Sequence, residues 1–199
     1  MKKVIIILTL SMLYACVSFA QVKFGLTAGL NGSNTTAAYE GGGSKTTNYM
    51  KAGFQAGAVM DFGITDNLSL LPELLFSQRG SKGKNSSLTL NYLQLPLNIA
   101  YKFNVGNGKL FVFGGMYFSY ALSGKGKSGV GNSFDIDFGS AENKYKPFDF
   151  GINAGTGYQY QKLFSKLQFN PGFGDLSNAD NISFKNTNFA ISLGYFFNK

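Results

Sequence analysis

The 199-residue sequence has no histidine, no tryptophan and one cysteine. Without an imidazole, the chain cannot form serine–histidine or cysteine–histidine nucleophile pairs, or metal centres with histidine ligands. Charged residues are also scarce, at 14% of the chain, whereas soluble globular proteins carry about 25%. We therefore expect a protein that is not an enzyme, has no cofactor or metal site, and is partly covered by something other than water.

A hydrophobic run long enough for a membrane-spanning helix is also missing. The apolar stretch 4–15 follows two lysines and is shorter than the roughly 20 residues that a spanning helix needs. A basic start, a short apolar centre and small residues near position 20 are typical of a secretory signal peptide. We predict that residues 1–20 are removed and that residues 21–199 form one domain. In the alternative, a lipoprotein signal, Cys16 becomes the lipidated first residue, although the bulky Tyr14 fits that pattern poorly.

Apolar and polar residues alternate along most of the remaining chain. Five segments alternate cleanly: 21–31, 50–62, 93–103, 148–160 and 188–197. Three more alternate less regularly, two of them interrupted by proline: 68–78, 109–122 and 166–173. Alternation with a period of two indicates β-strands with one apolar face. The pattern predicts an all-β fold, an eight-stranded antiparallel up-and-down transmembrane β-barrel.

The composition of the second face distinguishes a membrane barrel from a soluble one. A soluble lipocalin-like barrel would carry charge on its outer face, whereas a narrow lumen favours small neutral polar groups. The face opposite the apolar stripe consists mainly of Gly, Asn, Gln and Thr. Aromatic residues, Phe111 among them, gather near both ends of the strands and predict two interfacial girdles. We therefore place the apolar face in lipid.

The predicted connections alternate in length along the chain. Short links at 63–67, 104–108 and 161–165 alternate with longer ones at 32–48, 79–87, 123–147 and 174–187. Outer-membrane barrels have short periplasmic turns and longer extracellular loops. We therefore predict a location in the cell outer membrane with both termini in the periplasm.

The charged residues on the predicted inner face form the first candidate site. They are Lys23, Lys51, Asp61, Glu73, Arg79, Lys102 and Asp149. Glu73 lies in the middle of a strand, where an unpaired buried carboxylate would be costly. We expect a structural network of ion pairs that fills the bore; the alternative is a proton or ion relay. Eight strands leave room for side chains and little else, which argues against a wide diffusion pore.

The longest loop, 123–147, contains the second candidate site, because alternation resumes there in Phe134, Asp135, Ile136, Asp137 and Phe138. The simpler interpretation is a hairpin that continues the flanking strands beyond the membrane. The more specific interpretation is a sheet edge that binds a protein partner.

Basic residues in the outer loops leave a small excess of positive charge. This charge suits contact with outer-membrane lipid and the phosphates of lipopolysaccharide, although an ordinary mixed surface would show a similar excess. Nucleic-acid binding is disfavoured because the basic residues are scattered and include one arginine.

Four motifs resemble the small PorT-like family of outer-membrane barrels: residues 20–26 (AQVKFGL), 71–80 (LPELLFSQRG), 92–97 (YLQLPL) and 149–151 (DFG). The resemblance implies an eight-stranded barrel of the OmpA or OmpX kind, and the namesake belongs to a protein-secretion apparatus. We expect a barrel with a structural or surface-interaction role and a bore filled by side chains. The alternatives are a narrow porin-like channel for small solutes and a PorT-like component of a secretion machine.

Overall fold

The computed structural model describes residues 22–39, 45–129, 132–141, 144–179 and 182–198. The predicted signal peptide and Cys16 lie outside these residues, so both remain predictions. No helix within the described ranges is long and apolar enough to cross a membrane.

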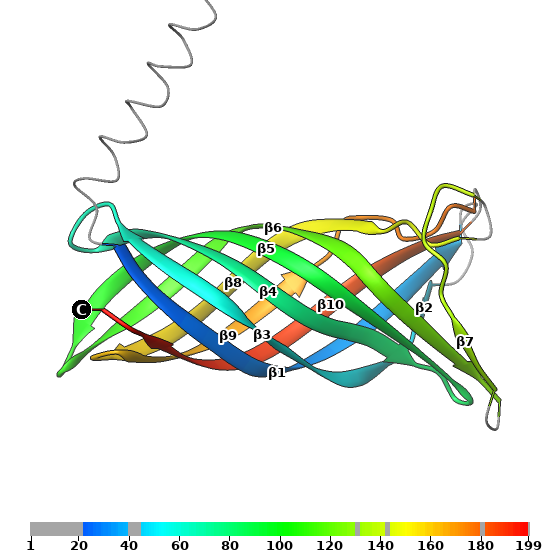
Figure 1. Ribbon diagram of the computed structural model, residues 1–199, viewed down its shortest axis with the longest axis horizontal. Coiled ribbons are helices and arrows are strands. Elements are labelled where there is room, and N and C mark those ends of the chain that lie inside the picture. The colour runs from blue at the N-terminus through cyan, green and yellow to red at the C-terminus, as the bar shows by residue number, and fades with distance from the viewer. Residues whose placement is uncertain (1–21, 40–44, 130–131, 142–143, 180–181, 199) are drawn as a thin grey trace, which may run out of the picture.

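Eight long strands close into a ring in which each strand pairs antiparallel with its neighbours (Figure 1). They are β1 (Val22–Tyr39), β3 (Tyr49–Gly63), β4 (Leu68–Lys82), β5 (Ser86–Val105), β6 (Gly108–Ser128), β8 (Phe148–Tyr160), β9 (Leu163–Pro171) and β10 (Ile182–Phe196). The first and last strands close the ring, in a register from Gly25–Phe196 to Tyr39–Ile182. Two short strands lie outside the ring: β2 (Lys45–Thr47) pairs with β1, and β7 (Asn132–Asp135) pairs with β6. The predicted eight-stranded antiparallel barrel is confirmed.

Side chains alternate between the two faces of the barrel as the pattern predicted. Leu26, Leu30 and Leu193 point outward and are exposed by 55–68%, whereas Thr27 and Asn31 between them are buried. Exposed leucines continue around the ring on β4, β5 and β9. An apolar belt of this extent is far larger than the patches that soluble monomers expose, and it matches the lipid-facing band of a membrane barrel.

The barrel has two different ends (Figure 1). At the turn end, short links join β3 to β4, β5 to β6 and β8 to β9, and Gly106 adopts the positive φ of 58° that a tight hairpin requires. Both ends of the described chain also meet there, because the Phe197 amide donates to the Phe24 carbonyl over 2.7 Å. The opposite end, the loop end, carries β2, β7 and three long connections, whereas the predicted long link at 79–87 is the short turn 83–85 between β4 and β5.

The strands extend further toward the loop end than alternation predicted. β1 continues to Tyr39 rather than residue 31, and β5 begins at Ser86 rather than residue 93. In β1 the added residues 32–36 are small or polar on both faces, whereas in β5 the apolar positions change face, because Leu90 and Tyr92 are buried and Leu93 is exposed. A projecting sheet therefore replaces much of what the sequence indicated as loop.

Candidate functional site

Large aromatic side chains fill the bore because glycines on the neighbouring strand leave room for them. Phe111 and Phe113 of β6 lie directly opposite Gly157 and Gly155 of β8, and a Cβ at either glycine would clash with the facing ring. The same pairing recurs at Tyr117–Gly151 and Phe164–Gly194. The prediction that Phe111 belongs to an interfacial girdle is therefore wrong. Its ring is buried inside the barrel, because a large ring and a facing glycine fit the narrow lumen together.

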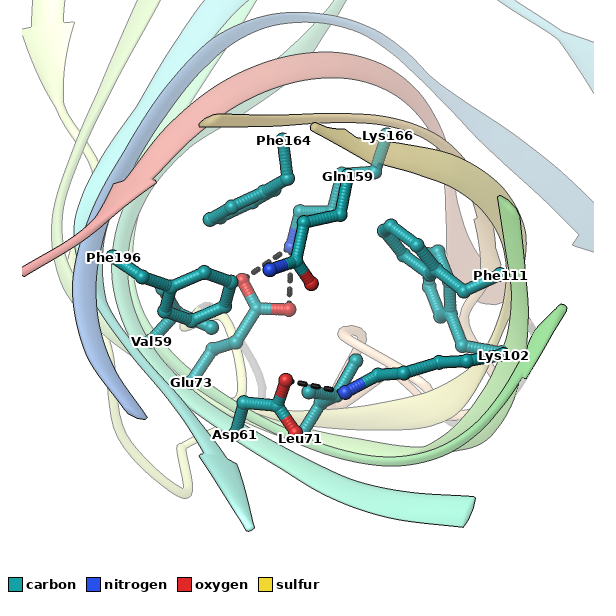
Figure 2. Close-up of a pocket in the computed structure, with 11 residues that line it drawn as sticks. Val59, Asp61, Leu71, Glu73, Lys102, Phe111, Gln159, Phe164, Lys166 and Phe196 are labelled. Atoms are coloured by element: carbon teal, nitrogen blue, oxygen red, sulfur yellow. Dashed lines mark hydrogen bonds and ion pairs between the residues drawn. The ribbon is translucent and has the colours of Figure 1, made fainter. Parts of the chain in front are cut away.

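Two ion pairs lie inside the lumen near the turn end, and the one between Glu73 and Lys166 crosses it (Figure 2). Both carboxylate oxygens of Glu73 on β4 accept hydrogen bonds from the Lys166 ammonium on β9, and Asp61 on β3 accepts one from Lys102 on β5. Glu73 and Lys166 are only 4% and 5% exposed. Because each charge has a partner, these groups escape the cost of an isolated buried ion.

Apolar side chains and Gln159 line the space around the Glu73–Lys166 pair, while Asp61 and Lys102 also border the open mouth at the turn end. Phe111, Phe113, Phe164 and Phe196 form one buried cluster with Val59, Leu71 and Ala100. Figure 2 shows the rings of Phe164, Phe196 and Phe111 arranged around the Glu73 carboxylate. The cavity left between the side chains measures about 20 Å³, room for about one water molecule. This layer closes the bore at the turn end.

Amide side chains form the middle layer. Asn153 donates to Asn98 over 3.1 Å, and Gln55 donates to Ser192 over 3.0 Å. Each bond joins two strands that are separated by one other strand in the ring, and the amides are buried. The neutral polar lining that the sequence indicated is present here, and these side chains form hydrogen bonds with one another.

A third layer, near the loop end, is built around Arg79. Its guanidinium lies 3.7 Å from the Asp149 carboxylate, measured from Nη1 to Oδ2, and donates to Gln94 over 2.6 Å. The rings of Tyr92 and Tyr117 lie 5.8 and 5.0 Å from the guanidinium carbon, within the range of cation–π contacts. Arg79 is 1% exposed and Asp149 is fully buried, so this layer also closes the bore.

Loop segments cover the third layer as an apolar lid. Leu176 is fully buried against Leu90 and Tyr92, and Phe138 and Tyr145 pack on the same cluster. The backbone secures the lid, because the Lys146 amide donates to the Leu176 carbonyl over 2.9 Å. Burial of the Tyr145 ring raises the pKa of its phenol. The lid therefore shields the Arg79 layer from solvent.

The structure brings five of the seven predicted lumen residues into ion pairs: Asp61, Glu73, Arg79, Lys102 and Asp149. Lys23 lines the open mouth at the turn end, together with Asp61 and Lys102. Lys51 does not join the network, because its ammonium donates to Thr89 and to the Leu88 carbonyl and lies near the exposed Lys82 and Lys127. A bulge in the β3–β4 ladder between Met50 and Gln55 shifts the side-chain alternation there, which a strict period of two does not anticipate.

Sequence reasoning missed Lys166, the partner of Glu73. The predicted strand at 166–173 included this lysine, although β9 runs from Leu163 to Pro171, but the lysine was not assigned to the inner face. The signal was present, because Lys166, Gln168 and Asn170 are buried and alternate with the exposed Leu167 and Phe169. That period would have placed this lysine on the inner face.

Some side chains of the predicted hairpin 134–138 pack in the lid, and the others lie on the surface. Ile136 and Phe138 pack against the lid cluster, so these two side chains belong to the lid. Phe134, on β7, is 52% exposed, and Asp135 and Asp137 are exposed as well. The hairpin itself forms, with Lys125–Asp135 and Ser128–Asn132 at the ends of its register.

A family model described as "Outer membrane protein beta-barrel domain" matches residues 19–178. The chain belongs to this family. It is an outer-membrane β-barrel protein, and its apolar belt contacts membrane lipid.

Several solved structures are similar to this family member. It is similar to Ail, the attachment invasion locus protein of Yersinia pestis, at 13% identity and a TM-score of 0.43, over 88% of this chain and 98% of that one. It is also similar to the outer-membrane protein OprG from Pseudomonas aeruginosa, at 13% identity and a TM-score of 0.48, over 89% and 96%. No curated protein matches the sequence.

Proposed function

We propose that this family member is a closed-bore barrel without enzymatic activity, whose role is structural support and display of its loop-end surface to a protein partner. The observation that carries the proposal is the filled lumen. An ion-pair layer, an amide layer and the Arg79 layer follow one another along the bore, and a lid covers the last. A solute would have to displace several buried charges to pass.

Conductance of the folded protein in planar bilayers tests the closed bore. We expect no steady conductance steps at moderate voltage, because the side chains around the Glu73–Lys166 pair leave a cavity of only about 20 Å³. Folding is verified first by the heat-dependent shift in gel mobility of β-barrels. Regular, reproducible conductance steps would overturn the closed bore and favour the narrow-channel alternative.

The proposed orientation places the turn end in the periplasm and the loop end outside the cell. Short periplasmic turns and longer outer loops support it, since the long connections gather at the end that carries β2 and β7 (Figure 1). If residues 1–20 are removed, the mature chain contains no cysteine. A single introduced thiol is then the only one.

Single-cysteine variants at the two ends test this orientation. Asp135 on β7 and Asp66 in the β3–β4 turn are both exposed, so Asp135→Cys and Asp66→Cys form a matched pair. On intact cells, a membrane-impermeant maleimide should label the first variant only. Labelling of the second variant alone would reverse the orientation.

The exposed side of the β6–β7 hairpin is the proposed partner surface. Among the described strands, β7 pairs only with β6, so its outer edge can accept a further strand. Photo-cross-linking from Phe134 in native membranes should capture a reproducible protein, whereas cross-linking from the lipid-facing Leu193 should not. Equal patterns from both positions would exclude the partner role, and a secretion component as the captured protein would support the PorT-like alternative.

A further inference from the structure

Four lysines gather on the outer wall of the barrel at the loop end, spread over β3, β4 and β6. They are Lys51, Lys82, Lys125 and Lys127, and we refer to them as the lysine patch. The register aligns Lys82 with Ser87 and Ser87 with Lys127, so the two lysines are separated by one strand. Because neighbouring strands lie about 4.8 Å apart, their backbones are about 10 Å apart. Lysine side chains are long enough to bridge this separation and to converge on one anion.

Lys51 is held between these two lysines by the local structure. Its aliphatic stem lies over Gly80, where a Cβ would come within 3.2 Å of the Lys51 Cδ. Its ammonium donates to the Thr89 hydroxyl and, over 3.1 Å, to the Leu88 carbonyl. Thr89 is in register with Lys125 on β6, so the ammonium is fixed in the centre of the patch.

The patch concentrates positive charge that has no counterion among the described residues. The positive charges of Lys82 and Lys127 both repel the Lys51 ammonium. Asp135 lies opposite Lys125 in the β6–β7 ladder, yet the ion pairs found within the described ranges all lie in the bore. Like charges held this close repel each other, and a bound anion would relieve that repulsion.

Below the patch, the outer wall changes from charged to polar to apolar. A lipid shows the same order from its headgroup to its acyl chains. The next row toward the barrel centre is polar, with Gln78 donating to Asn91 over 3.1 Å and Asn91 donating to Ser123 over 2.9 Å. The row below it is apolar and contains Phe76, Leu93 and Tyr120. Ammonium groups, amides and then an apolar surface match phosphates, sugar hydroxyls and acyl chains in turn.

From this arrangement we propose that the lysine patch binds the phosphates of lipid A, the acylated glucosamine anchor of lipopolysaccharide. This occupant fits better than a soluble anion because the amide and apolar rows lie directly beneath the ammonium groups. The wall on the other side of the barrel has no such cluster in this register. There Lys185 of β10 pairs with Thr36, and the neighbouring pair is Asn34–Thr187, so one lysine stands among uncharged residues. The inference rests on the proposed outward orientation of the loop end, because lipopolysaccharide occupies the outer leaflet.

Native mass spectrometry of the folded protein in neutral detergent tests the site without depending on orientation or conductance. The test variant is K82Q/K127Q, which changes two exposed side chains. The matched control is K109Q/K185Q, which removes the same charge from exposed lysines elsewhere on the barrel. Each lysine near a lipid headgroup contributes about a fivefold factor in affinity, so we expect the test variant to bind bisphosphorylated lipid A about 25-fold more weakly and the control to bind like the wild type.

Dephosphorylated lipid A, phosphatidylglycerol and inorganic phosphate separate the possible sources of the anion. We expect dephosphorylated lipid A to bind wild type and test variant with the same low affinity. Equal losses in the two double variants would overturn the site, and undiminished binding of dephosphorylated lipid A would overturn the role of the phosphates. Equally tight binding of phosphatidylglycerol or of phosphate alone would overturn lipid A as the occupant. If the proposed orientation is wrong, the maleimide experiment shows this independently of lipid A binding.

Discussion

The ion pair between Glu73 and Lys166 permits a quantitative test of the filled bore. Glu73→Gln keeps the side-chain volume and removes the charge, leaving the Lys166 ammonium buried without a counterion. That ammonium is 5% exposed and lies 6.0 Å from the centre of the Phe113 ring, so water gives it little compensation. Breaking a buried pair on one side costs about 3–5 kcal/mol, a large part of the 5–15 kcal/mol by which a typical domain is stable.

Urea unfolding in lipid vesicles measures this change in the free energy of unfolding. Because the chain has no tryptophan, far-ultraviolet circular dichroism and gel mobility are the readouts. The double variant Glu73→Leu, Lys166→Met removes both charges and should recover most of the loss, since apolar replacement of a buried pair is often neutral. Asp66→Asn, at an exposed turn carboxylate, should change stability by less than about 0.5 kcal/mol. Wild-type stability of Glu73→Gln would refute the reasoning.

Two further variants test the packing inside the bore and under the lid. Gly157→Val forces side-chain carbons into the ring of Phe111 and should destabilise the barrel by about 1–3 kcal/mol, as overpacking does. Gly114→Ala is the matched control, because the new Cβ would meet only one atom, at 3.5 Å; equal unfolding midpoints would contradict the packing. Leu176→Ala removes a fully buried lid side chain and should cost about 2–5 kcal/mol of local stability. Limited proteolysis of the lid should accelerate at unchanged barrel mobility, and an unchanged rate would show that Leu176 does not hold the lid.

The strands were predictable because lipid outside and a narrow lumen inside impose a period of two on the sequence. Segments such as 148–160 follow this period cleanly, and β8 spans those same residues. Lys51 was misplaced because a bulge changes the alternation through pairing with a neighbouring strand, which leaves no local mark in the sequence. The pairing of Glu73 with Lys166 was missed because the two residues lie 93 positions apart, and a local pattern can place a lysine on the inner face but cannot indicate which carboxylate it meets.

On strands such as β8 the inner face could be identified from its polar residues, but not the depth at which each of them lies. Depth depends on the stagger of the strands around the ring, which places Arg79 in the layer of Asp149 and Glu73 in that of Lys166. The same stagger sets Phe111 over Gly157 and moves an apparent girdle residue into the lumen. Composition showed that aromatic residues and glycines are abundant, and only the register showed that they face each other.

The sequence by itself determined the class of this protein: sparse charge and alternating apolar residues specify a barrel in a lipid environment. Those features are local, because each strand meets lipid and lumen independently of its neighbours. The tertiary structure decided which charges meet, that the bore is closed in successive layers, and that four lysines from three strands converge on one wall. These features depend on closure of the ring and on its register, since residues distant in the chain become neighbours only when the first and last strands pair.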